Sequence, residues 1–530
     1  MEKFTDQLAV FRTVTMNAGD KTSPRHSELS GGVDKAPTIT VLPSNHEHFH
    51  RKVLMPETTS VPLCVDLDGT LVLTDMLHES ILHWIRISPL ALPKMPFLLF
   101  SGKARFKHHA ATNHDFDPAN LPYNEEFLAW LRAQHALGRK LVLCTAADKR
   151  IAESIAAHLD IFEEVLASDG TTNLGGQIKA RTLVERFGEK GFDYAGNAEP
   201  DLHVWRKARR AITVNASRRL QRRVRSIATT EQNLSEPTPR LDAWFKALRP
   251  HQWLKNLLIF IPILAAHRLD EPGLIPTLLL AFAAFCLCAS SVYICNDLLD
   301  LESDRRHPRK KRRAFAAGTL PLWQGALLAP ALLGAGLYLA LLVDGTLWQW
   351  LTGYFVLTTL YSFGLKRLVL IDCLTLAMLY TTRILAGAAA IQMDMSFWLL
   401  AFSIFLFLSL AFIKRYAELQ VHQQAGKDKA HGRGYVTDDS PLVQTMGVVA
   451  GYAAVVVFAL YLRSDDVVRL YSRPEWVWGA VLAVLYWVSW MWLCAHRGKM
   501  HDDPLVFAIK DGPSLLAGAC FAAFLAVGTI

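Results

Sequence analysis

Long apolar runs dominate the second half of this chain of 530 residues. About nine apolar runs that are candidates to cross a bilayer as helices lie between residues 253 and 530, the first of them short. Backbone polar groups inside lipid must be satisfied within the span, so these runs predict a polytopic all-α membrane bundle. The predicted spans are 254–268, 274–295, 324–343, 346–363, 369–391, 396–413, 443–462, 475–494 and 513–529.

The first half has the character of a soluble protein. Between residues 60 and 215, short apolar runs alternate with helical stretches, and polar residues follow several of the runs. This pattern predicts a parallel α/β sheet with a ligand site at the carboxyl ends of its strands. We therefore predict a flexible arm at 1–58, an α/β domain at 59–217, a basic linker rich in Pro, Ser and Thr at 218–244, and a membrane domain at 245–530.

The arm contains three alternating histidines, His46, His48 and His50. In a segment of low complexity we interpret them as a chance pattern rather than as a metal site. The eight cysteines are scattered and lack metal-ligand spacing, so we expect them to be reduced.

The basic residues indicate an orientation in the membrane. The formal net charge is +8, and the Lys and Arg residues cluster beside apolar runs, which fits the positive-inside bias better than nucleic-acid binding. No signal-peptide pattern opens the chain, so we expect the α/β domain to stay in the cytosol of a cell with this protein in its inner or plasma membrane. Loops 296–320, 364–368, 414–442 and 495–512 are then cytosolic, and only loop 463–474 departs from the bias.

A cluster of acids ends the second predicted span. Asn296, Asp297, Asp300 and Asp304 precede a strongly basic run at 305–313. Charge at membrane depth is costly and usually marks a substrate or ion site. Helical spacing puts the three aspartates on one face, where they would repel one another without a cation between them. Mg²⁺ prefers oxygen ligands and bridges to phosphates, so we predict a Mg-diphosphate site with three aspartate ligands and Asn296 beside the substrate.

A second motif, VDLDGTL, occupies residues 65–71 in the α/β domain. Asp66 can attack a phosphorus atom while Asp68 donates a proton to the leaving oxygen. This segment resembles the first motif of the haloacid dehalogenase (HAD) superfamily of phosphatases. The resemblance implies a Rossmann-like parallel sheet with a small cap, and a Mg²⁺ site to which both aspartates contribute.

The resemblance continues along the domain. It implies that Thr145 binds the phosphate, that Lys179 neutralises charge, and that Asn197 and Asp201 complete the metal site. The family usually has an acid where this chain has Asn197, so we expect weaker Mg²⁺ binding. We interpret the α/β domain as an active phosphatase. The alternative is a HAD domain that serves only in regulation or docking.

An apolar stretch at 81–100, interrupted by prolines, lies where HAD enzymes carry a cap. It is either a membrane-touching cap that admits a lipid-linked substrate or an ordinary cap packed on its own domain.

The aspartate cluster resembles the first aspartate motif of the UbiA superfamily of intramembrane prenyltransferases, and the resemblance covers 245–530. Where that family has a second Asp-rich motif, this chain has Lys414, Arg415 and Glu418. The change favours direct binding of an anion there, although a positive-inside loop end also explains the two cations. The further substrate-binding candidates are Lys255, Asn256, Tyr361 and Lys366, beside Arg249. Arg383, inside the fifth span, is expected to have a substrate or a buried acid as its partner.

This combination resembles the branch of the superfamily typified by decaprenyl-phosphate phosphoribosyltransferase. The resemblance implies a polyprenyl phosphate acceptor and 5-phosphoribosyl 1-diphosphate (PRPP) as donor, with Mg²⁺ as cofactor. The fused phosphatase would then remove the 5-phosphate and give polyprenyl-phosphoryl ribose for cell-envelope glycans. A homo-oligomer is compatible with this reading.

Three alternatives remain open. The first is an aromatic prenyltransferase that uses a prenyl diphosphate and has a HAD domain with a regulatory or separate phosphatase role. The second is a transporter or channel with a regulatory domain. The third is a phosphatase whose membrane spans serve only as an anchor.

Overall fold

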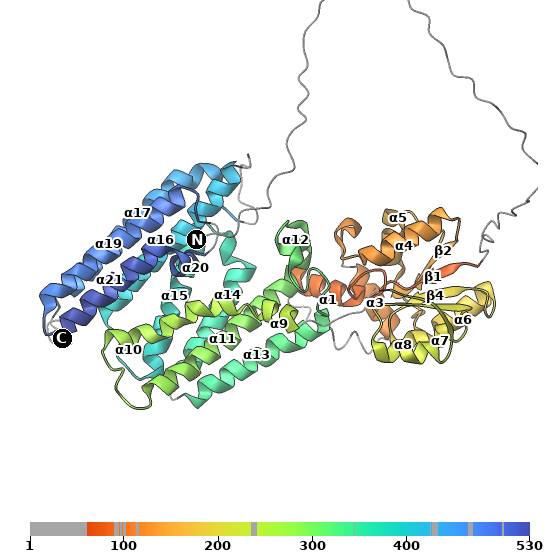
Figure 1. Cartoon of the computed structure of the whole chain (residues 1–530), viewed down its shortest axis with the longest axis horizontal. Helices are drawn as coiled ribbons and strands as arrows, with labels where there is room; N and C mark the ends of the chain where they lie inside the picture. Colours follow the sequence, from red (N-terminus) through yellow and green to blue (C-terminus); the bar gives the residue numbers. More distant parts are fainter. Residues whose placement is uncertain are drawn as a thin grey trace, which may run out of the picture. The chain divides into compact units, whose positions relative to one another are not determined.

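The structure is a computed structural model, and it describes most of the chain beyond the N-terminal arm (Figure 1). The described residues are 61–88, 95, 98, 102–112, 116–234, 241–343, 345–424, 426, 433–464, 470–500 and 503–529. The predicted arm and its three histidines, His46, His48 and His50, lie outside these residues, as does much of the predicted cap stretch at 81–100.

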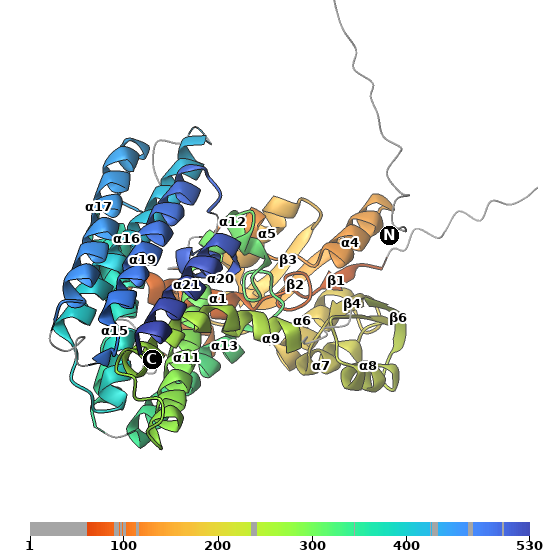
Figure 2. The same ribbon diagram turned by 60° about the vertical axis from the view of Figure 1, so that its left-hand side comes forward.

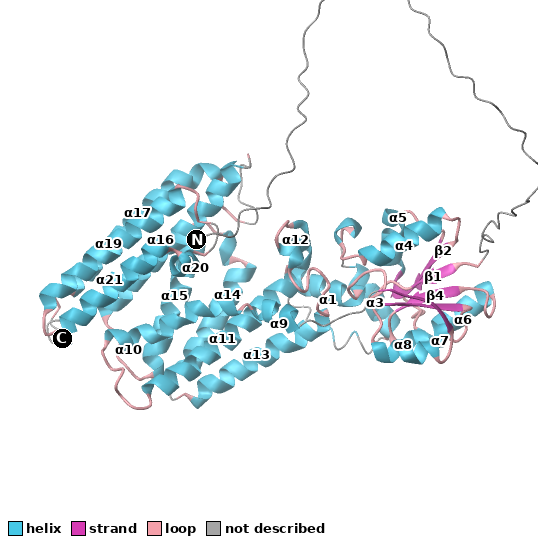
Figure 3. Ribbon diagram, in the orientation of Figure 1, coloured by secondary structure: helices cyan, strands magenta, loops and turns pink. Residues whose placement is uncertain are grey.

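The α/β domain is built on a six-stranded parallel sheet with the order β3-β2-β1-β4-β5-β6. Figure 3 shows the strands of this sheet in magenta. Its strands are β1 (Leu63–Val65), β2 (Leu141–Asp148), β3 (Glu164–Ser168), β4 (Asp193–Gly196), β5 (Arg210–Val214) and β6 (Thr229–Leu234). Strand β1 is buried throughout, as expected for the centre of a parallel sheet with both faces covered. Leu63 and Val65 pack on one face and Cys64 packs on the other.

Helices cover both faces of the sheet. They are α1 (Met76–Ile87), α3 (Lys103–Thr112), α4 (Glu125–Ala136), α5 (Lys149–Leu159), α6 (Gly176–Phe187), α7 (Leu202–Trp205) and α8 (Arg218–Arg225), with the 3₁₀ turns η2 (Pro118–Asn120) and η3 (Glu199–Asp201). Asn124 and Asp148 cap the N-termini of α4 and α5 through their side chains. The predicted α/β class is confirmed.

The predicted linker at 218–244 differs from the structure, because 218–234 forms α8 and β6. Ser217 caps α8, and Leu220 and Val224, one helical turn apart, bury their side chains in the domain core. Strand β6 then pairs with β5 and ends the sheet. The basic and Thr-rich composition of this segment led to the prediction of a linker, because only two apolar residues mark the buried face of α8. The α/β domain therefore extends to Leu234.

The second half is helical throughout its described part. Its helices are α9 (Leu241–Leu248), η4 (Pro250–Phe260), α10 (Ile261–Ala265), α11 (Leu274–Leu299), α12 (Leu301–Arg306), η5 (Lys310–Arg312), α13 (Leu322–Leu342), α14 (Leu347–Phe363), η6 (Leu365–Arg367), α15 (Ile371–Ala390), α16 (Phe397–Gln424), η7 (Thr437–Asp439), α17 (Ser440–Tyr461), α19 (Pro474–His496), α20 (Pro504–Lys510) and α21 (Gly512–Thr529). Figure 2 shows α16, α17 and α19 running alongside one another.

Seven helices within the described residues are long and apolar enough to cross a membrane. Helix α14, with 17 residues, falls on another predicted span. The first predicted span is broken into η4 and α10, with prolines at Pro250 and Pro262 near the start of each. The protein is an integral membrane protein, and the count of about nine spans is approximate.

Helix α16 extends well past the predicted end of the sixth span at 413 and runs to Gln424. Lys414, Arg415 and Glu418 therefore lie on a helix and not in the predicted loop that begins at 414. The helix continues because Arg415 is buried against partners from other segments, as described below.

Candidate active sites

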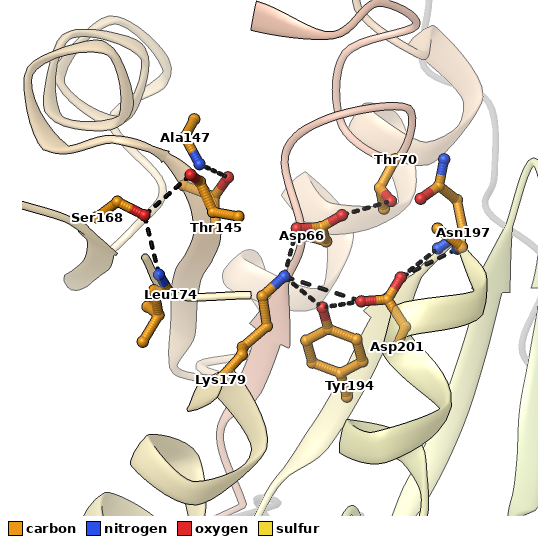
Figure 4. A network of polar contacts seen from close by, with 12 residues as sticks. Asp66, Thr70, Thr145, Ala147, Ser168, Leu174, Lys179, Tyr194, Asn197 and Asp201 are labelled. Atoms are coloured by element: carbon orange, nitrogen blue, oxygen red, sulfur yellow. Dashed lines mark hydrogen bonds and ion pairs between the residues drawn. The ribbon is translucent and has the colours of Figure 1, made fainter. Parts of the chain in front are cut away.

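The HAD-like motif lies where β1 ends at the carboxyl edge of the sheet (Figure 4). Asp66 is buried, and the Lys179 ammonium group donates a hydrogen bond of 2.7 Å to its Oδ1. Thr70 lies 3.5 Å from Asp66 Oδ2. Lys179 comes from α6, more than a hundred residues away, so the fold brings these two predicted site residues together.

Asp201 completes the acidic end of this site. Its Oδ2 accepts the backbone N–H groups of Asn197 and Ala198, at 3.1 and 3.0 Å. Its Oδ1 accepts a hydrogen bond of 2.7 Å from the hydroxyl of Tyr194, which in turn accepts one of 2.9 Å from Lys179 (Figure 4). Tyr194 was missed from the sequence, although its place on β4, just before Gly196, puts it at the same edge.

The side chain of Asn197 lies against the glycine of the first motif. A Cβ built on Gly69, which has φ of +73°, would come within 2.0 Å of Asn197 Nδ2. Gly69 is thus required for this close approach. The structure places Asn197 beside Gly69, which directly follows Asp68, and a role for Asn197 in metal binding stays a prediction.

The two aspartates of the motif have raised pKa values. Burial, then the neighbouring charge of Asp201, raises the pKa of Asp66 to about 6, against the opposing effect of Lys179. Burial, then the charges of Asp75 and Asp66, raises the pKa of Asp68 to about 8. The larger increase is that of Asp68, and a raised pKa suits a carboxyl group that acts as a general acid.

Strand β2 supplies the phosphate-binding end. Thr145 is fully buried, and its hydroxyl oxygen accepts the N–H of Ala147 at 2.9 Å, which leaves the hydroxyl hydrogen to donate to a phosphate oxygen. The carbonyl of Ala146 accepts a hydrogen bond of 2.8 Å from Lys107 on α3. Lys107 also reaches Asn173, at 3.1 Å.

The neighbouring residue on α3 binds the end of the same strand. His108 Nδ1 lies 2.8 Å from the buried Asp148 carboxylate. Helix α3 thus places two basic side chains on the strand that carries Thr145. The sequence analysis missed both, although α3 is a markedly basic helix in the region where a cap is expected.

In the membrane domain, the aspartate motif spans the junction of α11 and α12. Asp297 and Asp304 are buried and share one cation, since Arg313 Nη1 lies 3.1 Å from the first and 2.6 Å from the second. Arg249 lies 2.5 Å from Asp297 as well. Asp300, at the break between the two helices, lies 3.9 Å from Arg86 of α1.

Both acid sites have the donor chemistry that Mg²⁺ requires. In the membrane domain, Arg313 Nη1 lies between the carboxylates of Asp297 and Asp304. In the α/β domain, Lys179 Nζ lies 2.7 Å from Asp66 and 3.8 Å from Asp201. Within the described residues no three His, Cys, Asp or Glu side chains already form a metal-binding group. Metal binding at these carboxylates therefore stays a prediction.

Two of the predicted substrate-binding lysines meet at one carboxylate. Asp503, just before α20, lies 2.7 Å from Lys255 Nζ and 3.5 Å from Lys414 Nζ. The hydroxyl of Tyr380 also donates to it, at 3.2 Å. Asp503 was not predicted, because it lies 248 residues from Lys255 and only the packing of the bundle brings them together.

Arg415 and Glu418 belong to a different group. Arg415 is fully buried, lies 2.6 Å from the equally buried Asp372, and also contacts Glu418. Arg433 lies 3.3 Å from Glu418 and donates to the Tyr361 hydroxyl at 3.0 Å. Three predicted substrate-binding residues thus have protein partners in one ion-pair network, and their contact with a substrate stays a prediction.

The remaining candidates lie in two further places. Asn256 is fully buried, and its Oδ1 accepts a hydrogen bond of 2.8 Å from Arg383, which also donates to Tyr354. Arg383 also donates to the carbonyl of Leu379, so among the described residues the hydrogen-bond partners of its guanidinium are an amide, a hydroxyl and a backbone carbonyl, and the buried acid offered as one alternative is not among them. Asn296 is half-buried beside Asp297. Burial lowers the pKa of Lys366, and the nearby carboxylate of Asp300 opposes that effect.

Two family models match this chain. Residues 257–509 match the UbiA prenyltransferase family, and residues 63–197 match the haloacid dehalogenase-like hydrolases. Each match falls within one of the two domains described above.

Three relatives match this chain, one over most of its length and two over about half of it. An uncharacterized protein of Sinorhizobium fredii, y4nM, is 37% identical over 87% of this chain and 90% of its own length. The nodulation protein NoeC of Azorhizobium caulinodans is 39% identical over 51% of this chain and 88% of its own. The decaprenyl-phosphate phosphoribosyltransferase of Mycolicibacterium smegmatis is 31% identical over 52% of this chain and 88% of its own. The first relative therefore shares both domains.

Proposed function

Because this chain belongs to the UbiA prenyltransferase family and carries a haloacid dehalogenase-like hydrolase domain, we propose that it is a bifunctional membrane enzyme. The membrane domain transfers 5-phosphoribose from PRPP to a polyprenyl phosphate. The HAD-like domain then removes the 5-phosphate and yields polyprenyl-phosphoryl ribose, a lipid-linked pentose for cell-envelope glycans. The similarity to decaprenyl-phosphate phosphoribosyltransferases supports the first step.

The observation that carries the proposal is the meeting of Lys255 and Lys414 at Asp503. Two ammonium groups share one carboxylate, so the group has a net positive charge. Such a group attracts a phosphate monoanion or dianion, which a second magnesium–aspartate motif would do only through its metal. A donor and an acceptor that each carry a monophosphate need direct cationic binding of this kind.

In the transfer step, an oxygen of the lipid phosphate attacks ribose C1. The bond from C1 to the diphosphate oxygen breaks, and the diphosphate leaves with the bonding electrons. Mg²⁺, when bound by Asp297, Asp300 and Asp304, would supply positive charge for the departing diphosphate. Lys255 and Lys414 bind the monophosphates and align the attacking oxygen with C1.

In the hydrolytic step, the Asp66 carboxylate attacks the phosphorus of the 5-phosphate. The bond from phosphorus to the ribose oxygen breaks, and Asp68 gives its proton to that oxygen. Thr145 and Lys179 hold the phosphate oxygens. Asp68 then accepts a proton from the water that hydrolyses the aspartyl phosphate and returns to its starting state.

Both sites would face the cytosol of a cell with this protein in its plasma membrane. The basic segment at 305–313 follows the aspartate motif, in keeping with the positive-inside bias. PRPP is a soluble metabolite with several charges and would enter from that side.

Purified protein in vesicles tests the transfer step directly. Supplied with ribose-labelled PRPP, Mg²⁺ and a polyprenyl phosphate, it should release diphosphate and place the label in the lipid phase. A protein that instead joins a prenyl diphosphate to an aromatic acceptor, and leaves the PRPP label in water, would be a classical aromatic prenyltransferase of this family and not the enzyme proposed here.

A further inference from the structure

Helix α1 of the hydrolase domain makes a buried ionic contact with the transferase domain, within one compact unit of the chain. Both carboxylate oxygens of Glu79 accept hydrogen bonds from Arg305, at 2.8 and 2.6 Å. The two side chains are only 5% and 7% exposed. A two-point carboxylate–guanidinium pair has a fixed geometry, so it sets the orientation of α1 on the transferase.

The partner of Glu79 lies next to the aspartate motif in the sequence and is held by a backbone carbonyl. Arg305 directly follows Asp304 on α12, and its Nε donates to the carbonyl of Ala316 at 3.0 Å. Near the other end of α1, Arg86 lies 3.9 Å from Asp300. Two residues of one hydrolase helix therefore face the segment that carries the transferase acids.

The beginning of α1 is held by the hydrolase site. Asp68 accepts the N–H of Met76, the first residue of α1, at 2.9 Å. Leu73, between these two residues, touches Gly318 in the segment that follows the aspartate motif. A Cβ on Gly318, whose φ is +69°, would lie 2.6 Å from Leu73 Cβ. The loop with the hydrolase acid is thus in direct contact with the transferase domain.

We propose that α1 docks the hydrolase onto the mouth of the transferase so that the 5-phosphorylated lipid reaches Asp66 before it mixes with free lipid in the membrane. This inference rests on the proposed function. The polyprenyl chain keeps the product in the membrane, and only its ribose phosphate has to move. A hydrolase fixed at the exit meets that group at a high effective concentration.

A competition experiment tests this transfer between sites. The Asp66→Asn variant supplies unlabelled 5-phosphorylated lipid, which is added in excess to the intact protein in vesicles with labelled PRPP and polyprenyl phosphate. The wild type should dephosphorylate its own labelled product despite the competitor. Glu79→Gln and Arg305→Gln should dephosphorylate labelled lipid about tenfold less under the same competition.

Arg306→Gln is the matched control. It removes one positive charge from the next position on α12, where the side chain is 56% exposed and paired with Glu302. This variant should behave as the wild type does. Total label incorporation, and hydrolysis of p-nitrophenyl phosphate, should be the same in wild type, Glu79→Gln, Arg305→Gln and Arg306→Gln if each site is intact.

Two outcomes would overturn the inference. One is that wild type, Glu79→Gln and Arg305→Gln dephosphorylate the same fraction of labelled lipid in the presence of the competitor. The other is that the competitor lowers the dephosphorylation of labelled lipid in the wild type itself.

If the wild type gives no labelled lipid at all, the proposed function fails instead, and thermal melting of the whole chain then tests the contact between Glu79 and Arg305. Glu79→Gln and Arg305→Gln should lower the melting temperature alike, and the double variant no further, whereas additive effects contradict the docking contact.

Discussion

The network around Arg415 allows a prediction that separates structural from substrate-binding cations. In an Arg415→Met variant the buried Asp372 loses a partner at 2.6 Å, and both side chains are fully inaccessible to solvent. Loss of one member of such a pair costs about 3–5 kcal/mol, because the other charge stays buried. Tyr435 still donates to Asp372 at 2.8 Å and Arg433 remains at 3.7 Å, so we expect a cost near the lower end, about 3 kcal/mol.

That cost corresponds to a fall in melting temperature of about 6–12 °C for a domain of this size. The assay is thermal melting of the purified protein in one detergent at one scan rate, followed by tryptophan fluorescence. Lys414→Met is the matched control: it removes the neighbouring cation on α16, which is 31% exposed and lies 3.5 Å from its partner.

We expect the control to melt within about 2 °C of the wild type while its KM for PRPP rises. The reasoning is refuted if Arg415→Met melts as the wild type does and instead raises the KM for PRPP. Arg415 would then contact substrate, as the sequence analysis suggests.

Three further predictions concern the hydrolase domain. Asp68→Asn should slow phosphate release from the 5-phosphorylated lipid by about 10²–10⁴-fold through loss of the general acid, with an unchanged rate of label transfer to lipid. Lys107→Met should raise the KM for that lipid about tenfold and change kcat less, because α3 would lose a cation beside the strand that binds phosphate; an unchanged KM in steady-state assays contradicts this. Asn197→Asp should lower the Mg²⁺ concentration for half-maximal hydrolysis about tenfold, and a Mg²⁺ titration that shows no shift removes Asn197 from the metal site.

The sequence indicates which residues of the predicted hydrolase site lie together because strands place them, while their roles stay predictions. Asp66 and Thr145 each lie on or directly after a strand, and parallel strands bring their carboxyl ends to one edge. Lys179, near the start of α6, reaches Asp66 at the same edge. Tyr194 and Lys107 were missed because nothing in the local pattern says which side chains turn toward the site.

The membrane site was predicted less completely, for a different physical reason. Hydropathy gives the spans but not the rotation or neighbours of each helix. Asp503 meets Lys255 only because η4 and the segment before α20 pack together across the bundle. Similarly, a cation near the end of a span has the same sequence signature whether it binds substrate, as proposed for Lys414, or is neutralised by a buried acid, as Arg415 is by Asp372.

Segment 218–234 shows the limit of composition as a guide. Its arginines and threonines are typical of an exposed linker, yet Leu220, Val224 and Leu234 are buried and β6 pairs with the edge of β5. Pairing with β5 is a tertiary contact, which a reading of local composition does not contain.

Mass spectrometry of the lipid products from wild type, Asp66→Asn and Asp300→Ala tests most directly whether two reactions follow one another on this chain. The wild type should accumulate polyprenyl-phosphoryl ribose, Asp66→Asn the same lipid with a 5-phosphate, and Asp300→Ala no ribosylated lipid. A 5-phosphorylated lipid that is absent from Asp66→Asn, or ribosylated lipid that persists in Asp300→Ala, would contradict the account.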